Sequence, residues 1–107
     1  MDMSTRVRAP AVAGTFYPAD ADELRATVEG LLAEAGAGEA GSPRADRQQA
    51  PPKAMVAPHA GYAYSGPVAA SAYARLEGVA SADIQRVVLL GPAHRWPFRG
   101  LALPDVE

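Results

Sequence analysis

Histidine occurs twice in this chain, and each histidine follows an apolar run that ends in or contains a proline. His59 follows residues 54–58, and His94 follows residues 87–93. Neutral imidazole is a common protein ligand of Fe(II), Zn(II) and similar ions, and it also titrates near neutral pH, as a general acid or base must. The two positions therefore indicate a candidate metal or acid–base site. The alternative is that each imidazole hydrogen-bonds the backbone of its own loop.

The segments around the histidines predict elements that would bring them together. Residues 53–57 are typical of a short strand, and residues 86–90 of a buried parallel strand. Between them, apolar positions at helical spacing predict a helix that begins at Pro67 and closes at Gly78. In such a β–α–β unit the two strands lie side by side and ligands bind beyond their carboxyl ends. We therefore expect both imidazoles in one cleft.

Polar neighbours of the histidines are further candidates. Tyr62 and Tyr64 can orient a substrate, or they can pack one face of the loop. Arg95 can bind an anionic substrate, or form a surface salt bridge. A metal site would need a third ligand from elsewhere, since two histidines with one carboxylate or thiolate form a common open site.

The N-terminal third predicts a helix joined to the rest by a polar loop. Residues 9–18 are irregular, and Asp20 with Glu23 resembles a capping box. After them an apolar stripe recurs at helical spacing and ends at two glycines: Leu24, Val28, Leu31, Leu32, Gly36 and Gly38. Residues 36–52 have no periodicity and are expected to be a solvated variable loop.

Composition excludes several classes of protein. The 107 residues carry a net charge of −2 with scattered Lys and Arg, which gives no signal for nucleic acid binding. Cysteine is absent, so the chain offers no thiolate. Neither a membrane-spanning run nor a signal peptide is evident, which predicts a cytoplasmic protein. Residues 101–103 resemble the start of a further strand, so we expect an α/β protein that is part of a larger fold.

Three motifs together resemble the Memo family, whose microbial members are called AmmeMemoRadiSam system protein B. They are P-A-V-A-G-T-F-Y-P at residues 10–18, A-P-H-A-G-Y-A-Y-S-G at 57–66, and L-G-P-A-H-R at 90–95. They occur in the family's order and span nearly the whole chain outside residues 36–52. Some members carry a second histidine where this chain has Arg95.

The resemblance implies an α/β sandwich like that of class III extradiol dioxygenases, the LigB-like fold, with a β–α–β core of parallel strands. It implies that His59 and His94 are two ligands of a metal ion, iron or copper, with a cysteine as the third ligand. Residues 1–107 would then be the N-terminal portion of a single Memo-family domain. Since the family's cysteine lies further along the domain, we expect these residues alone not to complete a three-ligand site.

Two functions follow from the resemblance. The first is a metal-dependent oxidoreductase of dioxygenase type, with Tyr62, Tyr64 and Arg95 contacting substrate. The second is a non-enzymatic binding or accessory protein that retains the pocket without catalysis. The family's genes also associate with a radical-SAM protein and an AMMECR1-like domain, which are the partners that the resemblance implies.

Overall fold

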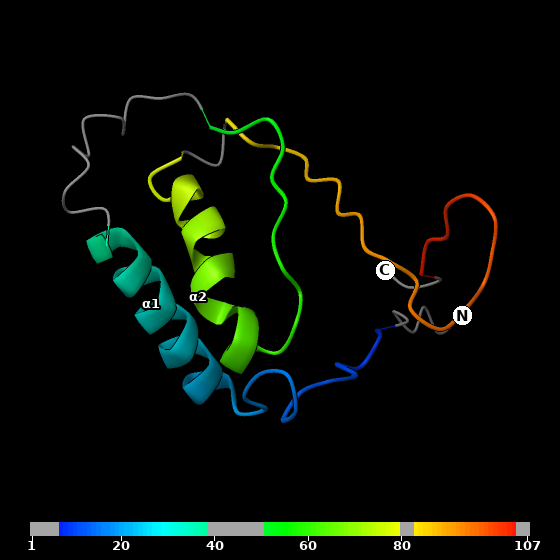
Figure 1. Cartoon of the computed structure of the whole chain (residues 1–107), viewed down its shortest axis with the longest axis horizontal. Helices are drawn as coiled ribbons and strands as arrows, with labels where there is room; N and C mark the ends of the chain where they lie inside the picture. Colours follow the sequence, from blue (N-terminus) through cyan, green and yellow to red (C-terminus); the bar gives the residue numbers. More distant parts are fainter. Residues whose placement is uncertain (1–6, 39–50, 80–82, 105–107) are drawn as a thin grey trace, which may run out of the picture.

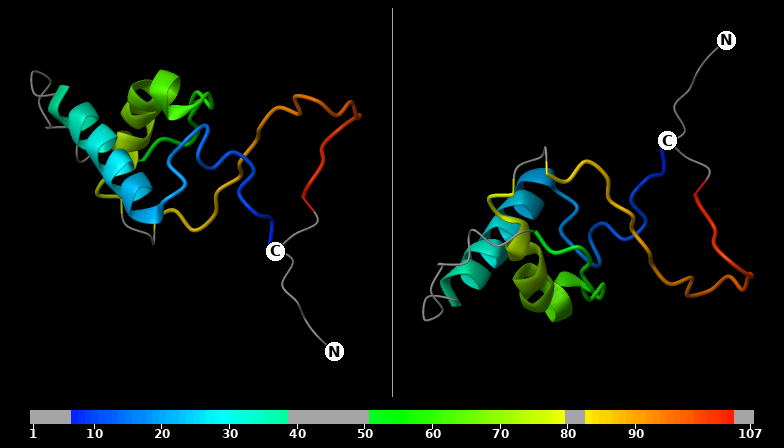
Figure 2. Two further views of the ribbon diagram at one scale, coloured as in Figure 1. Left: turned by 90° about the horizontal axis from the view of Figure 1, so that it is seen from below. Right: turned by 90° about the horizontal axis from the view of Figure 1, so that it is seen from above.

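Two helices that pack side by side form the main secondary structure of the described residues. The structure, a computed structural model, describes residues 7–38, 51–79 and 83–104. Helix α1 spans Ala21–Gly38 and α2 spans Tyr62–Tyr73, and a single 3-10 turn, η2, continues α2 over Ala74–Leu76. Residues 51–61 run beside α2, whereas residues 83–104 extend away from the helical pair (Figures 1 and 2).

Helix α1 begins where its capping residue predicts. The Asp20 carboxylate accepts hydrogen bonds from the backbone N–H groups of Asp22 and Glu23, at 3.1 and 2.9 Å. These N–H groups have no partner inside the helix, so the side chain replaces the missing acceptors. The predicted apolar stripe is half-buried: Leu24, Val28, Leu31 and Leu32. Its last three residues also line a pocket described below.

Helix α2 begins five residues earlier than the sequence predicted. We expected Pro67 in the first turn, but the helix starts at Tyr62 and Pro67 lies inside it. The first turn is instead closed by the Ser65 backbone N–H, which donates to the Gly61 carbonyl at 3.0 Å. Pro67 lies in the second turn, where it lacks the N–H that would otherwise donate to the carbonyl four residues earlier, so the helix forms with one backbone hydrogen bond fewer. The predicted end is confirmed, since Gly78 follows η2 with a φ of +80°.

The two helices meet through a small-residue face of α2. Ser65, Gly66 and Ala70 are its buried residues. A Cβ atom on Gly66 would lie 3.0 Å from the Leu31 Cδ1 atom, so a larger residue here would require the Leu31 side chain to shift by a few tenths of an ångström. The close approach fixes α2, and with it the loop that precedes α2.

The two segments predicted as strands are present as open chain. Among the described residues the only β-type pairing is an isolated bridge between Ala13 and Tyr17. Val56 is 98% exposed, and the apolar run 87–90 is likewise exposed. A parallel strand needs neighbours on both sides and cover on both faces, which these residues do not give each other. The α/β sandwich and the single-domain assignment stay predictions, and residues 39–50 of the expected variable loop lie outside the described part.

No helix in the described part of the chain combines the length and the apolar character needed to cross a membrane.

The cap of α1 gives a direct test of this arrangement. We expect Asp20→Ala to lower the free energy of unfolding by about 1 kcal/mol, because two N–H groups lose their acceptor. Asp20→Asn keeps an acceptor oxygen and should stay within a few tenths of a kcal/mol of the parent. Urea denaturation followed by far-ultraviolet circular dichroism measures both. Equal stability of the alanine variant and the parent would show that the cap does not stabilise α1.

Candidate two-histidine site

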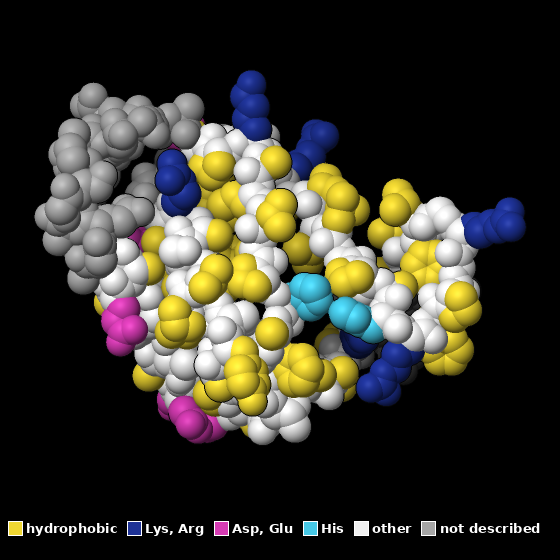
Figure 3. All heavy atoms as spheres, in the orientation of Figure 1, with side chains coloured by type: hydrophobic (Ala, Val, Ile, Leu, Met, Phe, Trp, Pro, Cys, Tyr) yellow, Lys and Arg dark blue, Asp and Glu magenta, His cyan; other side chains and the backbone are white. Residues whose placement is uncertain are grey.

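His59 and His94 meet at the edge of the helical body. Their Nε2 atoms lie 3.1 Å apart although 35 positions separate them in the sequence. The ring centroids are 5.2 Å apart and the ring planes are inclined at 50°. Both side chains are exposed, and they are adjacent on the surface in Figure 3. The structure thus brings together the two residues that the sequence predicted would converge, but it does so without a sheet between them.

The His59 loop, residues 58–61, is held by the N-terminus of α2. Gly61 is the N-cap residue of α2 and provides no side-chain cap, so the first N–H groups of the helix need other acceptors. The Tyr62 N–H donates to the Phe16 carbonyl at 2.7 Å. A Cβ atom on Gly61 would lie 3.5 Å from the Phe16 backbone, which shows how closely the two segments approach. The Phe16 carbonyl therefore acts as the missing cap of α2.

A tight turn in the N-terminal segment presents that carbonyl. The Phe16 N–H donates to the Val12 carbonyl at 2.9 Å, and the Gly14 N–H donates to the Tyr17 carbonyl at 2.7 Å. Gly14 has a φ of +83°, a conformation that favours glycine. The Tyr17 and Tyr62 rings lie against each other with centroids 5.8 Å apart. The sequence predicted an irregular segment here and, although residues 10–18 form one of the three family motifs, gave no indication that the segment supports the His59 loop.

His94 has fewer contacts that fix its position than His59 has. It lies in residues 91–100, all of which are exposed. Within the described residues, the contact with His59 is the one hydrogen-bonding contact between residues 83–104 and the rest of the chain. The position of His94 therefore depends on its pairing with His59.

The separation of the two nitrogens fits two physical states. Without a metal, one neutral imidazole can donate its Nε2–H to the other. With a metal, two ligand nitrogens at about 2.0–2.1 Å from one ion are roughly 2.9–3.4 Å apart, depending on the coordination angle. The observed 3.1 Å lies inside that range. The pair is therefore spaced as neighbouring ligands of one ion would be.

The described residues supply no third ligand of the usual types. No cluster of three His, Cys, Asp or Glu side chains occurs among them, and the chain contains no cysteine. The metal role of His59 and His94 stays a prediction.

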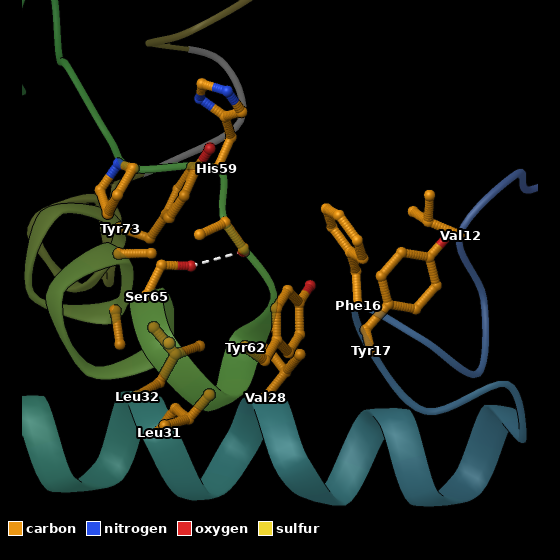
Figure 4. Close-up of a pocket in the computed structure, with 15 residues that line it drawn as sticks. Val12, Phe16, Tyr17, Val28, Leu31, Leu32, His59, Tyr62, Ser65 and Tyr73 are labelled. Atoms are coloured by element: carbon orange, nitrogen blue, oxygen red, sulfur yellow. Dashed lines mark hydrogen bonds between the residues drawn. The ribbon is translucent and has the colours of Figure 1, made fainter.

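His59 also borders an apolar pocket of about 490 Å³ between the two helices and the N-terminal turn (Figure 4). Aromatic side chains line it on several sides, namely Phe16, Tyr17, Tyr62 and Tyr73. Of the three predicted substrate contacts, only Tyr62 lines this pocket. Tyr64 is 87% exposed and lies outside the lining, as does the exposed Arg95.

Comparison with known proteins identifies the family. The sequence model described as "Memo-like protein" matches residues 8–104. The chain belongs to the Memo family. The match includes the turn of residues 12–17, the His59 loop and His94, so the family pattern covers every part of the two-histidine site.

Relatives come from all three domains of life. A "MEMO1 family protein" of Aquifex aeolicus is 43% identical over 83% of this chain and 28% of its own length. One of Ignicoccus hospitalis is 48% identical over 82% of this chain and 30% of its own length. "Protein MEMO1" of Homo sapiens is 35% identical over 98% of this chain and 32% of its own length. The chain thus spans less than a third of these Memo proteins, and no solved structure matches it.

The pairing of the histidines predicts mutual spectroscopic effects. Since the chain has two imidazoles in total, long-range ¹H–¹⁵N spectra resolve each of them. We expect His59→Ala to shift the Nε2 resonance of His94, and His94→Ala to shift that of His59, because each removes a hydrogen-bonding partner. Arg95→Ala is the control and should leave the Nε2 resonance of His59 unchanged. An imidazole indifferent to the loss of the other would contradict the 3.1 Å contact.

Proposed function

We propose that His59 and His94 are two ligands of a single metal ion in a Memo-type metal-binding protein. The Nε2–Nε2 distance of 3.1 Å carries this proposal, because it lies within the range expected for two neighbouring ligand atoms on one ion. Family membership supports it, since the matched region includes both histidines. The remaining ligand comes from a part of the domain outside the described residues.

Iron or copper is the metal we propose, since imidazole suits both ions. Such an ion would supply one-electron or dioxygen chemistry of the kind associated with class III extradiol dioxygenases. The chain's own residues would position the ion and offer a surface for a bound molecule. The N-terminus of α2 holds the loop of His59, and the pocket between α1 and α2 offers an apolar surface beside His59. Tyr62, in the wall of that pocket, presents a hydroxyl group able to hydrogen-bond a bound molecule.

A second candidate function is a binding or accessory role without catalysis. The apolar pocket beside His59 favours it, because a pocket lined mainly by apolar and aromatic side chains can bind a small molecule without catalysis. The cytoplasmic location predicted from the sequence is compatible with either function. So is partnership with radical-SAM and AMMECR1-like proteins, which rests on the family resemblance alone.

Metal binding by the chain is the test. We expect the protein, purified without a histidine tag, to bind one Cu(II) or Fe(II) ion weakly in equilibrium dialysis. His59→Ala and His94→Ala should each weaken binding by more than about tenfold, equal to 1.4 kcal/mol, because each removes one of two donors. Arg95→Ala, which changes the residue next to His94, should leave the affinity unchanged. Metal content that is insensitive to both histidine substitutions would overturn the proposal.

A further inference from the structure

Ser65 is a buried polar residue at the interface between α1 and α2. It is 6% exposed and is the one buried polar residue among those that the structure describes. Burying a hydroxyl costs free energy unless the hydroxyl is hydrogen-bonded. Alanine would fit the same small-residue face of α2 without that cost, so the hydrogen bonds of Ser65 must offset the cost of burying its hydroxyl.

The Ser65 hydroxyl reaches past its own helix to the His59 loop. Serine in a helix commonly donates to the carbonyl four residues before it, which here is Gly61 at 3.3 Å. The shorter bond, of 2.6 Å, goes instead to the carbonyl of Ala60, the residue directly after His59 (dashed line in Figure 4). That carbonyl lies before α2 begins. The hydroxyl therefore ties the loop to the helix at the residue next to a candidate ligand.

Two hydrogen bonds together restrain the backbone on both sides of Gly61. Ser65 holds the peptide group that precedes Gly61, through the Ala60 carbonyl. Phe16 holds the peptide group that follows it, through the Tyr62 N–H. Glycine has more backbone freedom than any other residue, so these restraints limit the movement of the loop about this position. His59 lies two residues away and would move with the loop.

We propose that Ser65 is a positioning residue, whose hydroxyl holds His59 at the place where it meets His94. This inference rests on the proposed metal-binding function, because it assigns Ser65 to the support of one ligand. Ser65 itself contacts neither the imidazoles nor a metal. Its contribution is to lower the cost of ordering the His59 loop when the two nitrogens bind one ion.

A matched pair of substitutions separates the hydroxyl from the packing. Threonine and valine have nearly the same shape, and only threonine carries a hydroxyl. We expect Ser65→Val to raise the Cu(II) dissociation constant about tenfold, at the low end of the effect of residues that support metal ligands. Ser65→Thr should stay within about threefold of the parent. Ser71→Ala is the control, because Ser71 makes a comparable bond to the Val68 carbonyl on the exposed side of the same helix.

The outcomes distinguish this inference from the metal proposal. If the histidine variants lose metal while Ser65→Val and Ser65→Thr bind it equally well, the hydroxyl of Ser65 does not position His59. The inference is then wrong, and the proposed metal-binding function stands. If the histidine variants keep their metal, the proposed function is wrong, and the inference about Ser65 is wrong with it. Helical circular dichroism is recorded for each variant. Loss of helix in Ser65→Val with Ser65→Thr intact would assign the hydroxyl to the fold, and loss in both would assign Ser65 to packing; either result would overturn the positioning role.

Discussion

The N-terminus of α2 is the point on which the two-histidine site depends. Helix N-termini leave backbone N–H groups without partners, and this one has glycine where a capping side chain would normally stand. The Phe16 carbonyl supplies one missing acceptor. That single bond joins the N-terminal turn to the start of α2. Because the His59 loop lies directly before α2, the same bond also fixes the loop.

The close packing of α1 and α2 makes this anchor rigid. Gly66 lets Leu31 approach, and Ser65 lies in the same buried patch with its hydroxyl directed at the loop. The side of α2 that packs on α1 is therefore also the side that holds His59. His94 has no comparable support from the described residues. The position of one candidate ligand, His59, is therefore fixed by the fold, whereas that of the other is not. An ion shared by both imidazoles would add the order that His94 lacks.

The sequence predicted local features better than long-range ones. The Asp20 cap and the apolar stripe of α1 were predicted correctly because they depend on neighbours within one or two turns. The predicted start of α2 was wrong because Pro67 was given more weight than the Phe16 carbonyl, which caps Tyr62 from forty-six positions away and which no local pattern reveals. The strands at 53–57 and 86–90 depend on partners that the described residues do not provide. The convergence of His59 and His94 was expected from a strand–helix–strand argument, yet the structure achieves it through a helix N-terminus and a turn.

The central claim is that both imidazoles bind one ion. Electron paramagnetic resonance of the chain loaded with one Cu(II) ion tests it most directly, because coordinated nitrogens split the copper signal and the chain has only these two histidines. We predict splitting from two imidazole nitrogens, reduced to one by either His59→Ala or His94→Ala. A spectrum with one imidazole or none in the unsubstituted chain would contradict the account.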